Sequence, residues 1–126
     1  MNSTENFHPL RDNKLRCTCQ HDKCDRRDVS QSHLDRVQLV RDRVGHPLKI
    51  TSGGRCPYHP SEINRTIPAD HQKQMAVDVA VTGSTRGNVV KAGIAVGCNA
   101  IGVAKTFVHL GYRRELPAGH LTMWVY

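Results

Sequence analysis

The feature that most constrains the fold is an alternation of side chains around Asp78. In the segment 76–81, three valines fall on one face of an extended chain, while Asp78 sits between two alanines on the other face. Because the valine face must pack on a core, the carboxylate has to point to the opposite side of a sheet. The segment 106–110 alternates in the same way and predicts His109 on the polar side of a second strand.

Two such strands lying side by side would bring Asp78 and His109 together, with His71 reaching in from the loop before them. Two imidazoles and one carboxylate suit a catalytic zinc ion, which keeps one position for water and lowers the pKa of that water toward neutrality. The alternative is a strand aspartate that only makes a hydrogen bond, beside two of the eight histidines. The spacing H-x6-D alone does not separate these interpretations, because it is looser than a helical H-E-x-x-H.

Three motifs frame the candidate ligands. They are the run ITSGGRCP at 50–57, the spacing from His71 to Ala76-Val77-Asp78, and Phe107-Val108-His109. Together they resemble the M15-type zinc peptidases, which include D-Ala-D-Ala carboxypeptidases and phage L-alanyl-D-glutamate endopeptidases. The resemblance covers most of the chain.

The resemblance implies roles for five residues. His71, Asp78 and His109 would hold the zinc ion, while Ser52 and Arg55 would position the substrate. A planar guanidinium suits the second task, because it donates two parallel hydrogen bonds to a carboxylate.

The chain also departs from the family pattern. Ala69 and Gln74 stand where the motif around the first histidine has serine and glycine. Gly111 stands where related sequences often have an aspartate, two residues after the last histidine.

The missing aspartate leaves the proton-transferring group unassigned. A zinc peptidase needs a group that takes a proton from the attacking water, typically worth ~10²–10⁴-fold in rate. Three other residues are candidates for this role: Asp70, Glu115 and His120. If none of them supplies it, the chain keeps the peptidase fold without turnover.

The chain has 126 residues, which fits one domain over 1–126. No apolar run approaches the ~20 residues that cross a bilayer, so no membrane insertion is expected. The first residues lack the basic and apolar regions of a signal peptide. We therefore expect synthesis in a host cytoplasm, followed by a location at the cell wall or in a virion.

A net charge of +7 attracts polyanions through long-range, salt-sensitive forces. Peptidoglycan stems and teichoic acids are anionic, and so is nucleic acid. Stacking on bases needs aromatic side chains interleaved with basic ones, and the chain has one Trp, three Tyr and two Phe. The composition therefore argues against sequence-specific nucleic-acid binding.

Five cysteines raise the question of a second metal. The segment 17–24 holds three thiols and an imidazole, enough for a closed zinc site, although the spacing matches no standard zinc finger. The candidate ligands are Cys17, Cys19, His21 and Cys24. A disulfide from this segment to Cys56 and simple reduced thiols are the alternatives. Cys98 is expected in the core.

Periodicity predicts one helix from Ser30 to Gly45 and another from Ser84 or Thr85 to about Val96. Residues 1–28 are expected to be an irregular, cysteine-bearing segment. Strands are predicted at 48–51, 76–81, 98–103, 106–110 and 121–126. The expected fold is α+β: a small antiparallel sheet carrying the zinc site, with about two helices packed on its other face.

These observations predict a zinc-dependent hydrolase, a metallopeptidase that cleaves the stem peptides of peptidoglycan in cell wall degradation. The short chain favours a bacteriophage endolysin or a protein that opens the wall during infection. The alternative is a virion structural or wall-docking protein that contacts other virion proteins and has reduced or no catalytic activity.

Overall fold

The computed structural model describes residues 2–126, and its centre is a five-stranded sheet with the order β1-β2-β4-β3-β5. Neighbouring strands are antiparallel except β3 and β5, which run parallel. The α+β class is confirmed, with one parallel pair in a sheet that was expected to be antiparallel. The strands are β1 (Ile50–Ser52), β2 (Ala76–Ala80), β3 (Ala100–Val103), β4 (Phe107–Gly111) and β5 (Thr122–Val125).

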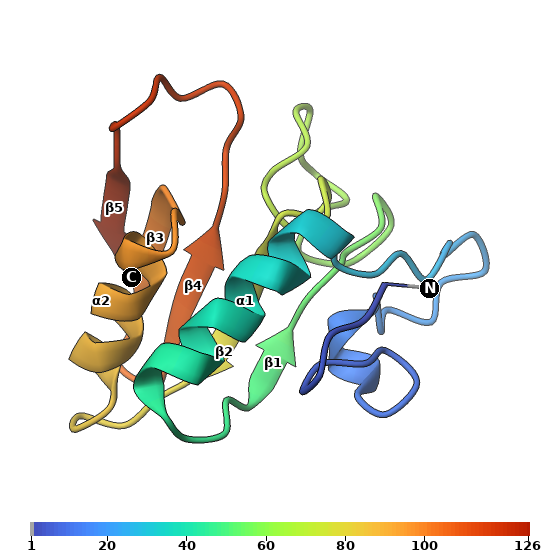
Figure 1. The fold of residues 1–126 in the computed structure, drawn as a ribbon. Helices are drawn as coiled ribbons and strands as arrows, with labels where there is room; N and C mark the ends of the chain where they lie inside the picture. The colour runs from blue at the N-terminus through green and yellow to red at the C-terminus, as the bar shows by residue number, and fades with distance from the viewer. Residues whose placement is uncertain (1) are drawn as a thin grey trace.

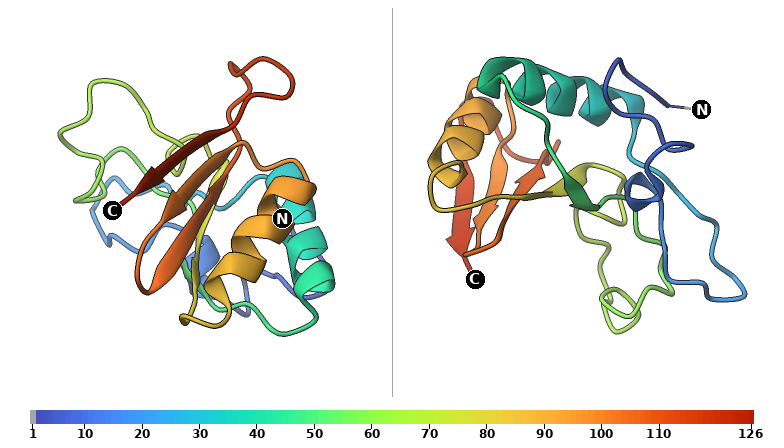
Figure 2. Two further views of the ribbon diagram at one scale, coloured as in Figure 1. Left: turned by 90° about the vertical axis from the view of Figure 1, so that its left-hand side faces the viewer. Right: turned by 90° about the horizontal axis from the view of Figure 1, so that it is seen from below.

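Two helices, α1 (Gln31–Val44) and α2 (Arg86–Ala95), cover the same face of the sheet (Figures 1 and 2). Ser30 caps α1, because its Oγ accepts a hydrogen bond from the His33 N–H. Gly45 ends α1 with a φ of 75°, a left-handed conformation that costs glycine no Cβ clash. Neither helix in the described residues is long and apolar enough to cross a membrane.

Alternation divides the sheet into an apolar face and a polar face. On the apolar face, Val77 pairs with Leu110, and Leu110 pairs with Ile101; all three lie in the core below the helices. On the other face, one residue of each strand lies beside its register partners, so that five residues form a row across the sheet. We call this set the polar row, and its members are Ser52, Asp78, His109, Gly102 and Trp124.

The N-terminal segment, residues 2–30, is irregular apart from a 3-10 turn at Asn13–Leu15, as predicted for 1–28; residue 1 lies outside the described part of the chain. The segment lies beside β1 at the edge of the sheet (Figure 1). The Gly54 N–H donates to the Leu15 carbonyl at 3.1 Å, and a Cβ on Gly53 would lie 2.7 Å from the same oxygen. This close approach seats the segment directly on the loop after β1.

A buried histidine joins α1 to the sheet. His33 is fully buried, and its Nε2–H donates to the Leu110 carbonyl at 2.9 Å. Burial penalises the charged imidazole and lowers the pKa of His33 to about 4. The unfolded chain takes up the same proton near pH 6.5, so the folded protein binds fewer protons between these values. The stability that depends on neutral His33 is therefore complete above pH 6.5 and declines as the pH falls toward 4.

We expect His33→Gln to flatten this pH dependence, because an amide keeps a donor for the carbonyl without titrating. The slope of the unfolding free energy between about pH 4 and 6.5 should fall by roughly 1.4 kcal/mol per pH unit relative to the parent. Urea unfolding at several pH values measures the slope, and the exposed His120→Gln serves as the control. Equal slopes for His33→Gln and the parent would mean that folding does not lower the pKa of His33.

Candidate metal centre

The three predicted metal ligands meet on the polar face of the sheet. His71 Nε2 lies 3.3 Å from Asp78 Oδ1, and His109 Nδ1 lies 3.2 Å from the same oxygen. Their ligand atoms all lie within 4.8 Å of one another, and all three residues are buried. Asp78 and His109 are direct register partners across β2 and β4, while His71 comes from the loop before β2.

The donor set and its spacing fit zinc. Bonds of ~2.0–2.1 Å in a tetrahedron place neighbouring nitrogen and oxygen ligands about 3.3 Å apart, which agrees with the two separations from Asp78 Oδ1. The remaining nitrogen of each imidazole is also engaged. His71 Nδ1 donates to the Gly53 carbonyl at 2.7 Å, and His109 Nε2 donates to Asp70 Oδ2 at 3.0 Å. These bonds hold protons on His71 Nδ1 and His109 Nε2, so a bound metal would displace the protons that face Asp78 and take His71 Nε2 and His109 Nδ1 as its ligands.

The electrostatics of the cluster favour a positive charge. Burial raises the pKa of the Asp78 carboxyl, but hydrogen bonds from His109 and His71 outweigh it and hold this pKa well below its usual range. Burial lowers the pKa of His109, yet Asp70 and Asp78 together raise it above its ordinary value. Two ionised carboxylates therefore flank one imidazole, an arrangement that a bound cation would stabilise.

A carboxylate occupies the space beside Gly111, although it comes from another segment. Asp70 Oδ2 accepts the hydrogen bond from His109, and Arg113 donates to both Asp70 oxygens at 2.9 and 3.1 Å. A Cβ on Gly111 would lie 2.9 Å from His109 Nε2 and 3.2 Å from Asp70 Oδ2. Because Gly111 has no side chain, Asp70 from the loop before β2 can occupy this space.

Arg55 directs its guanidinium toward the ligand cluster. Its Nε donates to Ser52 Oγ at 3.1 Å, and its terminal nitrogens lie 3.5 Å from Asp78 Oδ2 and 3.8 Å from Glu62 Oε2. These separations exceed the ~2.7–2.9 Å of a tight charged hydrogen bond, so the group keeps donor capacity for another oxygen. Ser52 therefore contacts Arg55 and orients it.

A cavity of about 410 Å³ opens over the ligands. Trp124 forms part of its wall, with its ring 5.1 Å from the His109 ring and 5.2 Å from the Arg113 guanidinium. Gly102 permits this position, because a Cβ there would lie 2.6 Å from the indole Nε1. The cavity is also lined by three arginines and two further aromatic residues: Arg55, Arg65, Arg113, Phe107 and Tyr126.

Glu62 is a cavity residue that the sequence analysis missed. It is 2% exposed, and its Oε2 accepts a hydrogen bond from Arg65 Nε at 3.2 Å. Its Oε1 is buried without a hydrogen-bond partner among the described residues. Glu62 lies in an irregular loop between β1 and β2, so no periodicity marks it; an acid near the RCP motif was the one available signal.

The other residues considered for proton transfer lie elsewhere. Glu115 pairs with Lys73 at 3.8 Å on the surface, and both side chains are about half exposed. His120 lines a different cavity, with Leu116 and Pro117. Of the three candidates, Asp70 alone lines the cavity over the ligands.

The cysteine cluster has a different membership from the predicted one. Sulfur atoms of Cys17, Cys19, Cys24 and Cys56 lie within 4.8 Å of one another, and His21 is not part of the group. The His21 ring stacks on Tyr58 with 4.5 Å between centroids, while its Nδ1 accepts the Lys23 N–H. Cys56 thus stands where His21 was predicted. All five cysteines are free thiols, and Cys98 is buried in the core as expected.

We expect Gly111→Asp to destabilise the protein by about 1–3 kcal/mol, because the new side chain meets Asp70 and crowds two carboxylates. Adding Asp70→Ala should recover most of this loss, since it vacates the same space. A double-mutant cycle on unfolding free energies measures the coupling. Gly83→Asp is the control, because a Cβ at Gly83 has no neighbour within 4 Å. Additive effects at 70 and 111 would contradict the shared space.

The comparison with protein families agrees with this geometry. The sequence model of the family described as Peptidase M15 matches residues 8–111. This span contains both helices, strands β1 to β4 and the three candidate zinc ligands on the polar face. No curated protein and no solved structure matches the chain. With four fifths of the chain inside the match, the chain belongs to the peptidase M15 family and is a metallopeptidase-type hydrolase.

Proposed function

We propose that the chain is a zinc-dependent peptidase that cleaves the stem peptides of peptidoglycan. The observation that supports this most directly is the cavity over His71, Asp78 and His109, with Arg55 at its side. When bound, zinc supplies Lewis acidity that polarises a carbonyl and makes water acidic near neutral pH. The three buried ligands and their hydrogen-bond partners would hold such an ion without further rearrangement.

The charge of the cavity supports an anionic peptide as substrate. Arg113 is neutralised by Asp70 and Arg65 is paired with Glu62, whereas Arg55 keeps long contacts to its acidic neighbours. We therefore assign substrate binding to Arg55, with Ser52 as the residue that orients it. A stem peptide carries free carboxylates that suit this guanidinium, and the net charge of +7 adds attraction to an anionic wall.

Glu62 and Asp70 would divide two tasks between them. Both oxygens of Asp70 accept hydrogen bonds from Arg113, and one also accepts from His109, so Asp70 is a positioning residue for that ligand. Glu62 Oε1 has no partner among the described residues, although the side chain lines the same cavity. Of the three carboxylates that line the cavity, Glu62 is the one that is neither a candidate ligand nor hydrogen-bonded to a ligand histidine, so we propose Glu62 as the proton carrier.

A phage lysis protein, or one that opens the wall during infection, is the setting that we propose for this activity. The second candidate is a virion structural or wall-docking protein, packed against other virion proteins, that has kept the fold but lost turnover. Gly111 favours this candidate, because the aspartate often present in related sequences is absent there. The buried acids of the cavity favour the peptidase instead.

Digestion of purified sacculi separates the two candidates. We expect the zinc-loaded protein to release soluble peptides, a chelator to stop the release, and fragment masses to identify the cleaved bond. His71→Ala should abolish release and remove one zinc ion per chain, because two ligands no longer complete the site. Zinc-loaded protein that releases no peptide would favour the structural candidate.

We expect Glu62→Gln and Asp70→Asn to differ in what they change. Glu62→Gln should lower kcat by about 10²–10⁴-fold with zinc affinity unchanged, because the amide cannot accept the proton. Asp70→Asn should weaken zinc binding by about 10–100-fold and recover activity at saturating zinc, because it acts through His109. Zinc titrations followed by kcat at saturating metal make the comparison. The reverse pattern would exchange the two roles.

A further inference from the structure

Four cysteines from two distant segments meet outside the cavity described above. Cys17, Cys19 and Cys24 come from the N-terminal segment, and Cys56 follows Arg55 in the loop after β1. Cys19 Sγ lies 3.4 Å from Cys56 Sγ, and all four sulfur atoms lie within 4.8 Å of one another. A disulfide would need about 2.05 Å, whereas tetrahedral zinc with ~2.3 Å bonds places sulfur atoms about 3.8 Å apart.

From this geometry we infer that Cys17, Cys19, Cys24 and Cys56 bind a second zinc ion with a structural role. Four thiolates complete a tetrahedral shell and leave no open position for substrate or water, unlike the two-histidine, one-aspartate site. Cysteines alone supply the ligands of this second ion, so its binding does not require the chain to be an active peptidase.

Burial and backbone N–H groups act on the four sulfur atoms in opposite directions. At Cys19, Cys24 and Cys56, burial outweighs the N–H two residues further along the chain and raises the pKa of each thiol, so a metal ion would have to displace the proton. At Cys17, burial is outweighed by the N–H groups of Cys56 and Cys19 and by the neighbouring thiols, and the pKa is lowered. The Arg26 N–H donates to Cys24 Sγ at 3.3 Å, the kind of hydrogen bond that orients a metal ligand.

Basic side chains offset the charge of such a site. Zinc with four thiolates carries two negative charges, and Lys23, Arg26 and Arg27 belong to the same segment. Arg27 already pairs with Asp25 at 2.6 Å. Arg26 lines the same surface cavity as Cys17 and Cys24. These cations would therefore offset part of the negative charge of a zinc site with four thiolates.

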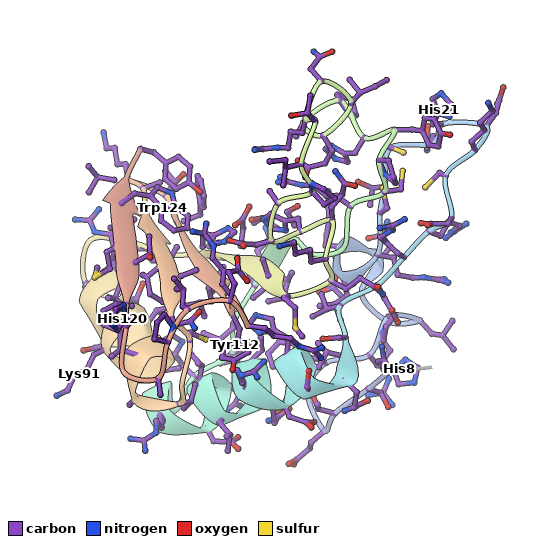
Figure 3. The ribbon with its side chains drawn as sticks, turned by 90° about the horizontal axis from the view of Figure 1, so that it is seen from above. His8, His21, Lys91, Tyr112, His120 and Trp124 are labelled. Carbon is purple, nitrogen blue, oxygen red and sulfur yellow. The ribbon has the colours of Figure 1, made fainter. Side chains whose placement is uncertain are left out.

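The ion would join two parts of the chain, and hydrogen bonds extend the link to a third. Residues 17–24 contain no helix or strand, and Figure 3 shows His21 at the outer end of this segment, on the opposite side of the view from Trp124. Cys56 adjoins Arg55, whose N–H donates to the His71 carbonyl at 3.2 Å. Arg27 donates to the Gln72 carbonyl at 2.9 Å. A metal at the cysteines would therefore clamp the N-terminal segment to the loops that carry Arg55 and His71.

Metal counting under reducing conditions tests the inference. Native mass spectrometry of the full chain should find two zinc ions in the parent and in His21→Gln, but one in Cys56→Ser and one in His71→Ala. Loss of zinc in His21→Gln with retention in Cys56→Ser would overturn the assignment of Cys56. A parent with one zinc ion that His71→Ala removes would overturn the second site while leaving the proposed peptidase site intact.

Cobalt gives a readout that does not depend on whether the serine variant folds. Cobalt-loaded His71→Ala should show intense thiolate-to-cobalt charge-transfer absorption in the near ultraviolet, which nitrogen and oxygen ligands do not produce. Zinc should also slow tryptic cleavage after Lys23, Arg26 and Arg27, and a chelator should restore it. Absence of the charge-transfer band, or a parent mass two hydrogens lower from a disulfide, would overturn the inference.

Discussion

The buried carboxylate of Asp78 is the interaction on which the rest of the structure depends. A charge at this depth is costly unless donors surround it, so the neighbouring segments supply them. His109 faces it across the sheet, and His71 approaches from the preceding loop. Each of these imidazoles is held in turn by one acceptor, Gly53 or Asp70. The ligands are thus preorganised by hydrogen bonds that lie outside the cluster itself.

Those outer contacts explain how the site accommodates a glycine at position 111. A hydrogen bond to His109 requires an acceptor at one point in space, and the sequence position that supplies it is immaterial. Asp70 reaches this point from the loop before β2, and Arg113 holds it there with two hydrogen bonds. The departure at Gly111 and the acid at Asp70 are therefore one structural feature, because a side chain at 111 would compete for the same volume.

The N-terminal segment contributes to the site although it carries none of the ligands on the polar face. It packs on Gly53, whose carbonyl orients His71, and its cysteines gather around Cys56, which follows Arg55. Local backbone hydrogen bonds and a few ion pairs hold the loop between β1 and β2, which contains no helix or strand. The N-terminal segment packs on one side of this loop and the sheet on the other. Together they set the positions of the candidate metal ligands and of Arg55.

Local patterns in the sequence determined both helices, including the two caps of α1 at Ser30 and Gly45. They also determined which face of the sheet carries Asp78 and His109. Backbone periodicity decides these features within a few residues, so they can be predicted without knowledge of the fold. Tertiary structure decided four other features. They are the parallel pairing of β5, the burial of Glu62, the position of Asp70 beside Gly111, and the presence of Cys56 instead of His21 in the cysteine cluster. Each depends on contacts between segments far apart in the chain, and no local spacing encodes such contacts.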